Sequence, residues 1–257
     1  MTSVYENLEQ NKNTAGTAVI EEIDHFATLA TEWWDPDGEF RSLHKINPIR
    51  IKYIRDQICH HFGRSTKDIK PLSGLSILDV GCGGGLICEP LTRLGANVTG
   101  IDAAEKSIKI AKNHSRSMSL DIDYRAQLPE ELDATEEKYD VLINMEVIEH
   151  VKDVEVFMNT CVKLIQPGGY MIASTINRTL KSFALAKIGA EYILRWVPIG
   201  THDWQKFVRP SEFCYHIRTN GMNIEDITGI KINILEDIWE FSKDLDINYL
   251  ITAKKPL

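Results

Sequence analysis

Residues 77–85 read Ile77-Leu78-Asp79-Val80-Gly81-Cys82-Gly83-Gly84-Gly85, and the pair Ile101-Asp102 follows further along the chain. A short apolar run leads to an acid, Asp79, glycines fill four of the five positions 81–85, and Asp102 comes 23 residues after Asp79. Roughly 20 residues separate the glycine loop from the ribose-binding acid in a nucleotide-binding βαβ unit. The pattern therefore predicts a Rossmann-like α/β domain that binds an adenosine-containing ligand.

Two details of this loop indicate which adenosine ligand it holds. The dinucleotide pattern requires glycine or alanine three places after its second glycine, whereas here Gly81 and Gly83 are followed by Leu86. Asp79 also places a carboxylate beside the loop, where it would repel a pyrophosphate and attract a cation. S-adenosylmethionine (SAM) carries a sulfonium, an amino group and ribose hydroxyls that Asp102 could accept from. We therefore predict SAM as the cofactor, against the alternatives of a structural glycine turn or a nicotinamide site.

Length and composition narrow the class of protein further. The chain has 257 residues, of which 43% are hydrophobic and 26% are charged, and this composition suits one large globular domain. Its net charge of −8 argues against a groove that binds nucleic acid. Its first twenty residues contain no apolar core of a signal peptide, and no run of about 18 apolar residues occurs. We expect a cytoplasmic protein with reduced thiols, since the cysteines are odd in number and lack CxxC spacing: Cys59, Cys82, Cys88, Cys161 and Cys214.

Strand-like and helix-like segments alternate from residue 76 onward, which predicts a parallel sheet wound on both faces. The glycine loop resembles motif I of the class I SAM-dependent methyltransferases, which implies the sheet of that class. We expect seven strands, mostly parallel, with helices on both faces, N-terminal helices, and a helical insertion before the last strands. Residues 1–16 are predicted to be disordered, 17–257 to form a single domain, and 178–205 to form the insertion or lid. The predicted strands are 76–80, 97–101, 121–125, 139–144, 170–175, 226–235 and 246–253, and the predicted helices are 18–32, 47–62, 86–94, 105–114, 153–165 and 210–220.

A second group of polar residues follows the predicted strand that ends at Asn144. Glu149 and His150 come three and four positions after Glu146, so a helical turn would place all three side chains on one side. Two carboxylates and an imidazole suit a divalent cation such as Mg²⁺, with zinc as an alternative. The same acids could instead complement a helix N-terminus, with the imidazole packed on the sheet.

A methyl acceptor must present a lone pair, and a phenol with a pKa of roughly 10 is mostly protonated at neutral pH. A bound cation would lower that pKa and orient the oxygen. His150 could alternatively act as a general base without any metal. Both mechanisms remain open at this point.

Several separated motifs, in this order, resemble the ubiquinone-biosynthesis O-methyltransferase family over about residues 20–253. They are Trp33-Trp34-Asp35-Pro36, Gly38-Glu39-Phe40, Leu43 to Arg50, Asp79 to Gly85, Met145 to His150, Ser174 to Arg178, Gly189 to Arg195, Pro198, Gly200 to Asp203, and Phe207. Residues 121–133 and the polar N-terminus depart from the family pattern, which leaves the adenine contact undefined.

The resemblance implies O-methylation of polyprenylated catechols, namely 2-polyprenyl-6-hydroxyphenol and 3-demethylubiquinol. It implies that SAM is held by Arg50, Gly81, Asp102 and Met145, beside the loop residues Asp79 and Gly83 named above. Arg50 could pair with the methionine carboxylate of SAM, although an exposed helical arginine is the plain alternative. Related members also imply a divalent ion at Glu146, Glu149 and His150.

Residues 181–197 mix charged and aromatic side chains, which suits either a helix lying on a membrane or a lid over the active site. The implied partners are a polyprenylated substrate, a membrane surface at the inner face and other enzymes of ubiquinone biosynthesis. Two alternatives from other classes are a nicotinamide oxidoreductase and a non-catalytic SAM-binding scaffold. The first is disfavoured by Asp79 and Leu86, and the second would not need the cluster at Glu146 to His150.

Overall fold

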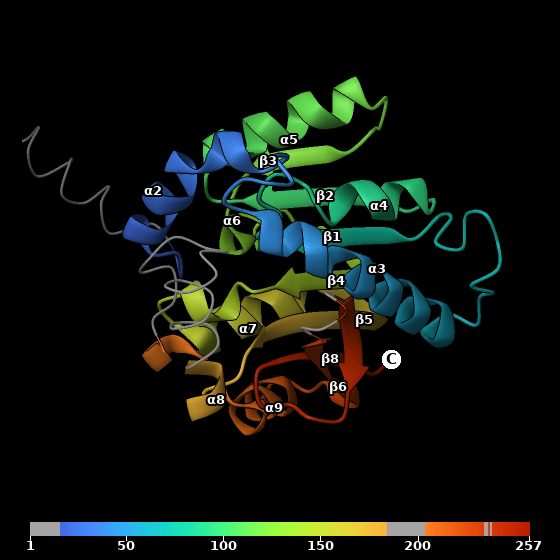
Figure 1. Ribbon diagram of the computed structural model, residues 1–257. Coiled ribbons are helices and arrows are strands. Elements are labelled where there is room, and N and C mark those ends of the chain that lie inside the picture. Colours follow the sequence, from blue (N-terminus) through green and yellow to red (C-terminus); the bar gives the residue numbers. More distant parts are fainter. Residues whose placement is uncertain (1–15, 184–203, 234–235, 237) are drawn as a thin grey trace, which may run out of the picture.

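The computed structural model describes residues 16–183, 204–233, 236 and 238–257, and its centre is one twisted sheet (Figure 1). The order of the described strands is β3-β2-β1-β4-β5-β8-β6-β7. Neighbours from β3 to β5 are parallel, and β8, β6 and β7 join antiparallel. The strands are β1 (Ser76–Val80), β2 (Asn97–Asp102), β3 (Asp123–Ala126), β4 (Tyr139–Met145), β5 (Ile165–Ile176), β6 (Asn223–Asn233), β7 (Ile238–Ser242) and β8 (Asn248–Lys254).

This topology confirms the predicted Rossmann-like α/β fold with a mostly parallel inner sheet, but the predicted number of seven strands is wrong. Eight strands are present among the described residues, because β7 forms a hairpin with β6 and extends the sheet by one strand. At five residues, β7 is short, and the sequence prediction assigned no strand between 235 and 246. Its edge position means that only β6 pairs with it.

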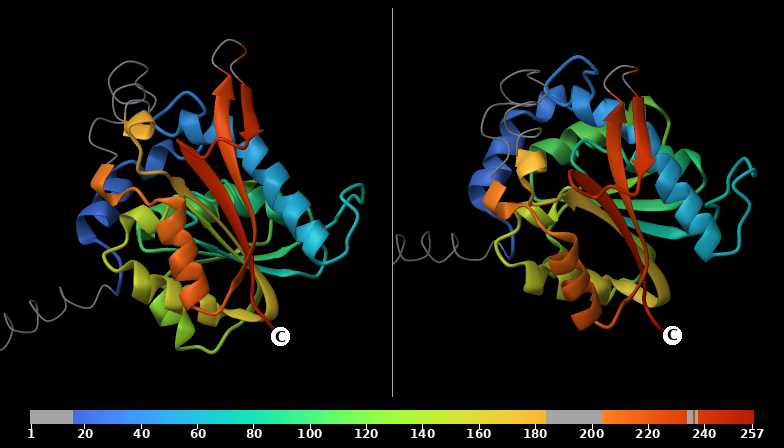
Figure 2. Two further views of the ribbon diagram at one scale, coloured as in Figure 1. Left: turned by 90° about the horizontal axis from the view of Figure 1, so that it is seen from below. Right: turned by 60° about the horizontal axis from the view of Figure 1, so that its bottom comes forward.

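Helices cover both faces of the sheet, as predicted, and each face has its own hydrophobic core (Figure 2). On one face, α3 (Arg41–His61), α4 (Cys88–Arg93) and α5 (Glu105–Ser117) pack against residues such as Ile77 and Val141. On the other face, α6 (Pro129–Asp133), α7 (Val154–Leu164) and α9 (Pro210–Thr219) pack against residues such as Leu78 and Leu142. The five cysteines are free and buried, as expected.

The helix α3 begins earlier than the sequence predicts. We expected it to start at residue 47, just before Pro48, but the helix starts at Arg41 and continues through the proline. Ile46 is buried in the core on this face, so tertiary packing stabilises the first turns ahead of Pro48. The shorter N-terminal helix α2 (Ile20–Thr28) and the 3₁₀ turn Ala30–Glu32 fill most of the predicted helix at 18–32.

The two tryptophans that follow α2 pack onto the glycine loop. Trp33 stacks on Phe40 with ring centres 3.9 Å apart, and its Nε1 donates a hydrogen bond to Ser107 Oγ over 3.2 Å. Trp34 stacks on His114 at 3.5 Å and donates from Nε1 to the carbonyl of Gly84 over 2.9 Å. The N-terminal segment is therefore held directly against the loop that the sequence assigns to the cofactor.

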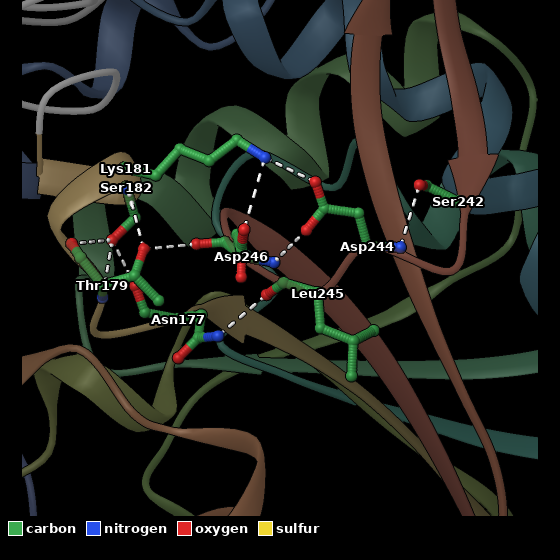
Figure 3. Close-up of polar contacts among 8 residues, drawn as sticks. All are labelled: Asn177, Thr179, Lys181, Ser182, Ser242, Asp244, Leu245 and Asp246. Atoms are coloured by element: carbon green, nitrogen blue, oxygen red, sulfur yellow. Dashed lines mark hydrogen bonds and ion pairs between the residues drawn. The ribbon is translucent and has the colours of Figure 1, made fainter.

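The chain that leaves β5 is fastened to the loop between β7 and β8 (Figure 3). Asn177 Nδ2 donates to the Leu245 carbonyl over 2.9 Å, and Thr179 Oγ1 donates to the Asp246 carbonyl over 2.6 Å. The ammonium of Lys181 pairs with Asp244, which lies in the same loop. These contacts fix the beginning of the predicted insertion next to the C-terminal strands.

Several predictions fall on residues outside the described part of the chain. The first is the disorder of residues 1–16, of which only residue 16 is described. The second is the insertion or lid at 178–205, which includes the segment 181–197 and of which most residues lie outside the described part. These assignments stay predictions, as does the assignment of 17–257 to a single domain. In the part of the chain that the structure does describe, no helix has the length and apolar character needed to cross a membrane.

Candidate active site

A cavity of about 400 Å³ opens at the carboxyl ends of the parallel strands. Ligands of open α/β sheets bind at this edge, because the loops after the strands converge there. The cavity receives every residue that the sequence assigned to the site: Arg50, Asp79, Gly81, Gly83, Asp102, Met145, Glu146, Glu149 and His150. It continues toward the antiparallel strands, where its wall includes Ile230, Ile232, Trp239, Ile247 and Asn248.

The glycine loop is shaped by its protein neighbours as well as by its backbone. Gly81 has φ +75°, and its N–H donates to the Ile101 carbonyl over 2.8 Å, which ties the loop to β2. A Cβ on Gly81 would lie 2.4 Å from Val147, and one on Gly83 would lie 2.4 Å from Trp33. We predicted these glycines for close approach of a ligand, and the structure adds that aromatic and aliphatic side chains need the same space.

The two acids that flank the loop lie in different surroundings. Asp79 is buried, and burial raises the pKa of its carboxyl to about 7, although the Cys88 thiol donates a hydrogen bond to it over 3.1 Å. Burial also raises the pKa of Asp102, whose carboxylate accepts from the N–H groups of Gly83 over 2.9 Å and Ala104 over 2.8 Å. Asp102 thus braces the loop while still lining the cavity at the end of β2.

Arg50 is buried on α3, so the alternative of an exposed helical arginine is wrong. Its guanidinium donates to Glu146 Oε1, and its Nε is buried without a hydrogen-bond partner. A buried guanidinium with one N–H left unpaired is suited to a further anionic partner, because an unsatisfied buried donor costs roughly 1–3 kcal/mol. Arg50 can therefore take a ligand carboxylate in addition to Glu146.

Glu146 is the centre of the polar network in the cavity wall. It follows β4 with φ +56°, a left-handed backbone conformation that is uncommon for a residue with a side chain. Its Oε1 accepts from Arg50, from Ser174 Oγ over 2.7 Å and from Asn248 Nδ2 over 2.9 Å. Burial acts to raise the pKa of Glu146, but the charge of Arg50 and these hydrogen bonds bring it below its ordinary value.

Glu149 and His150 lie on a 3₁₀ turn, Ile148–His150, that begins after Glu146. The predicted helical turn therefore covers two of the three polar residues. Burial and the nearby charge of Glu146 raise the pKa of Glu149, whose Oε2 accepts from Thr175 Oγ1 over 2.9 Å. Glu149 is accordingly protonated near neutral pH, unlike Glu146.

His150 lies beside Glu22, with its Nδ1 3.2 Å from Glu22 Oε2. Burial acts to lower the pKa of His150, but the hydrogen bond to Glu22 raises it above the ordinary value. The pKa of Glu22 is itself lowered to about 2 by its hydrogen bond with His150, despite partial burial, and Lys206 adds a second contact over 2.8 Å. An ionised carboxylate can only accept, so Nδ1 carries the hydrogen and Nε2 is left as the basic atom.

Within the described ranges, no group of three or more His, Cys, Asp or Glu side chains has the arrangement of a metal site. Glu146 is engaged by Arg50, Glu149 is protonated, and His150 is turned to Glu22, so these three groups do not fit a cation as they lie. The metal site stays a prediction from the sequence, and we derive no chemical step from it.

Sequence reasoning missed Glu22, Ser174, Thr175 and Asn248 as members of the site. Glu22 lies on a different helix from the motif it supports, and 128 positions separate it from His150. Ser174 and Thr175 fall inside a quoted motif, Ser174 to Arg178, which could have drawn attention to them. Asn248 carries no signal in the sequence, because only the pairing of β8 with β5 brings it next to Glu146.

Comparisons with known proteins identify the family. Residues 78–173 match the family model described as a methyltransferase domain. Ubiquinone biosynthesis O-methyltransferase of Sinorhizobium medicae is 51% identical over 95% of this chain and 99% of its own length. The protein of the same name from Agrobacterium fabrum is 50% identical over 95% of this chain and 98% of its own.

Solved structures support the fold assignment. The magnesium protoporphyrin IX methyltransferase of Synechocystis PCC 6803 with bound SAH aligns over 92% of this chain and 98% of its own, with a TM-score of 0.63 and 19% identity. The plantazolicin methyltransferase in complex with SAH aligns over 93% of this chain and 98% of its own, with a TM-score of 0.62 and 15% identity. At these identities the similarity supports the fold alone.

Proposed function

The chain belongs to the family of the ubiquinone biosynthesis O-methyltransferases, which use SAM, and we propose that its acceptor is a polyprenylated catechol or quinol. The proposed substrates are 2-polyprenyl-6-hydroxyphenol and 3-demethylubiquinol, each methylated on a ring hydroxyl. The observation that carries this proposal is the 51% identity to a relative of that name over nearly the whole of both chains. Membership of the family decides against the oxidoreductase and the non-catalytic scaffold.

We assign SAM to the half of the cavity formed by the ends of β1, β2 and β4. When bound, SAM supplies a methyl group on a sulfonium, which is transferred by in-line displacement. In this assignment the backbone of Gly81 and Gly83 borders the cofactor, and Asp102 accepts hydrogen bonds from its ribose hydroxyls. Met145 packs beside it at the end of β4. Arg50 pairs with the carboxylate of SAM through the N–H that Glu146 leaves free.

We assign the acceptor to the other half, toward β6, β7 and β8. Its wall is apolar there, with Ile230, Ile232, Trp239 and Ile247, which suits the first part of an isoprenoid tail. His150 lines the same cavity and is the proposed general base that takes the phenolic proton at Nε2. Glu22 orients the ring and stabilises the imidazolium that results. Contact with a membrane and with other enzymes stays a prediction from the sequence.

The proposed activity is tested by methyl transfer from labelled SAM to a short-chain 3-demethylubiquinol, in parallel reactions with EDTA and with added Mg²⁺. We expect the O-methylated product in both reactions, because the base and the cofactor residues are complete without a metal. Absence of product in both, while SAM still binds, would contradict the proposed acceptor. Product that disappears only with EDTA and returns with Mg²⁺ would contradict the base mechanism and support the predicted metal site.

Replacing Asp79 with asparagine is expected to remove a pH dependence of SAM binding. Because the pKa of Asp79 is about 7 without ligand, its carboxyl is mostly protonated at pH 6 and ionised at pH 8. A cationic ligand favours the ionised form, so the affinity of the natural chain for SAM should rise about tenfold from pH 6 to pH 8. Titration calorimetry at three pH values should show this rise, and Asp79→Asn should give a weaker and flat profile.

Unfolding by urea provides the matching check on Asp79. The folded pKa lies above the usual 3.8, so the stabilising protonation is fully present below pH 3.8 and is lost as pH rises through 7. Asp79→Asn should therefore be at least as stable as the natural chain at pH 8. A SAM affinity of the natural chain that does not change with pH would exclude Asp79 from the cofactor site.

A further inference from the structure

One oxygen atom in the wall of the acceptor half has no hydrogen-bond partner. Asn248 is 7% exposed, and its Oδ1 is buried and unpaired. Asn248 lines the cavity. Leaving a buried acceptor without a donor costs roughly 1–3 kcal/mol, so a ligand that brings a donor to this place gains that free energy.

The orientation of Asn248 is fixed by its neighbours. Its Nδ2 donates to Glu146 Oε1 over 2.9 Å, and the same oxygen accepts from the guanidinium of Arg50. Turning the amide over would place two oxygens against each other, so Oδ1 has to be the atom left unpaired. Ser174, fully buried on β5, donates to the same Oε1 over 2.7 Å and holds the carboxylate in place.

The unpaired atom selects for a hydrogen-bond donor, because an amide oxygen can only accept. A hydroxyl satisfies it, whereas a carbonyl or a methoxy oxygen brings a second acceptor and is rejected. A quinol or catechol offers such a hydroxyl, and the corresponding quinone does not.

We infer that Asn248 Oδ1 recognises the hydroxyl that lies next to the one being methylated. The inference rests on the proposed function and adds a specificity-determining residue to it. The two proposed substrates differ in ring substitution, but each carries a hydroxyl vicinal to the target oxygen in its reduced form. One site for that vicinal hydroxyl would therefore let a single cavity serve both ring systems, with His150 left to take the proton of the target hydroxyl.

Steady-state kinetics with two matched acceptors tests this inference. The first is a catechol with a short prenyl tail, and the second is the phenol that lacks only the vicinal hydroxyl. We expect the natural chain to prefer the catechol by about 100-fold in kcat/KM, since a site built to bind a hydroxyl strongly rejects the analogue without it. Asn248→Leu, of similar size, should lower the ratio of kcat/KM for the catechol to kcat/KM for the phenol by at least about tenfold.

Thr252→Val is the matched control, because Thr252 is a fully buried polar residue on the same face of β8 that does not line the cavity. It should keep the preference for the catechol. Equal use of both acceptors by the natural chain would overturn the inference whatever the variants do. Equal loss of both acceptors in Asn248→Leu would overturn it too, since Asn248 would then serve only to position Glu146.

Equilibrium binding separates failure of this inference from failure of the proposed function. Titration calorimetry of both acceptors into the chain saturated with S-adenosylhomocysteine requires no turnover. Tighter binding of the catechol, lost in Asn248→Leu, supports the inference even if neither acceptor is methylated. Asn248→Ser replaces the leucine variant if that variant does not fold, and the same loss of preference is expected.

Discussion

Replacing His150 with asparagine is expected to lower kcat by about 10²- to 10⁴-fold while leaving SAM affinity within a few-fold of the natural chain. The range is that of a positioned general base removed from a proton-transfer step. His150 lines the cavity, and Glu22 holds the hydrogen on its Nδ1, so that Nε2 is left as the basic atom. Single-turnover methyl transfer and calorimetry with SAM measure the two quantities separately.

The pH profile distinguishes a base from a merely structural imidazole. Glu22 raises the pKa of His150, and the base must be neutral to act. Glu22→Gln should therefore lower the pKa of His150 and shift the acid limb of kcat against pH toward lower pH. His61→Asn serves as the matched control and should leave kcat unchanged, because His61 is the last residue of α3, stacks on Tyr170 and does not line the cavity.

A kcat in His150→Asn within threefold of the natural value would contradict the assignment of the base. An unshifted acid limb in Glu22→Gln would also contradict the assignment, since the limb would belong to another group.

Replacing Arg50 with methionine is expected to weaken SAM binding by about 100-fold or more and to destabilise the chain by about 3–5 kcal/mol. The first effect follows from the loss of a charge-assisted pair with the SAM carboxylate, and the second from leaving Glu146 buried without its cation. Arg50 and Glu146 are both shielded from solvent, with side-chain exposures of 6% and 18%. Calorimetry with SAM and urea unfolding report the two effects.

The double variant Arg50→Met with Glu146→Gln separates binding from stability. Removing the stranded carboxylate should restore most of the lost stability, because no uncompensated charge remains buried. It should not restore SAM affinity, since the guanidinium is still absent. Recovery of both quantities together would mean that Arg50 acts only as the partner of Glu146 and does not hold the cofactor.

Much of the site was predictable because its chemistry lies in short stretches of sequence. The loop from Asp79 to Gly85 follows one strand, and the motif from Met145 to His150 follows another. Since parallel strands end at one edge of a sheet, the alternation of strands and helices was enough to bring these stretches together. The position of Asp102 followed from the same rule applied to the next strand.

The predictions that were wrong or incomplete concern packing between distant segments. From the helical pattern alone, Arg50 could be an ordinary exposed arginine. The packing of α3 on the sheet buries its side chain. The apolar spacing predicted a helix from residue 47, whereas α3 begins at Arg41 and Ile46 is buried in the core. The strand β7 is short, and its assignment depends on the hairpin it makes with β6 rather than on a pattern of its own.

The sequence by itself determined the order of the elements, the glycine loop with its two acids, and the ExxEH motif that follows β4. These are local properties, set by hydrophobic periodicity, by glycine and by spacing within one βα unit. Only the tertiary structure decided which charges compensate one another, namely Arg50 with Glu146 and Glu22 with His150. It also decided that Asn248 donates a hydrogen bond to Glu146. The physical reason is that the protonation and partners of buried polar groups depend on neighbours from other helices and strands, more than a hundred residues away for Glu22 and Asn248.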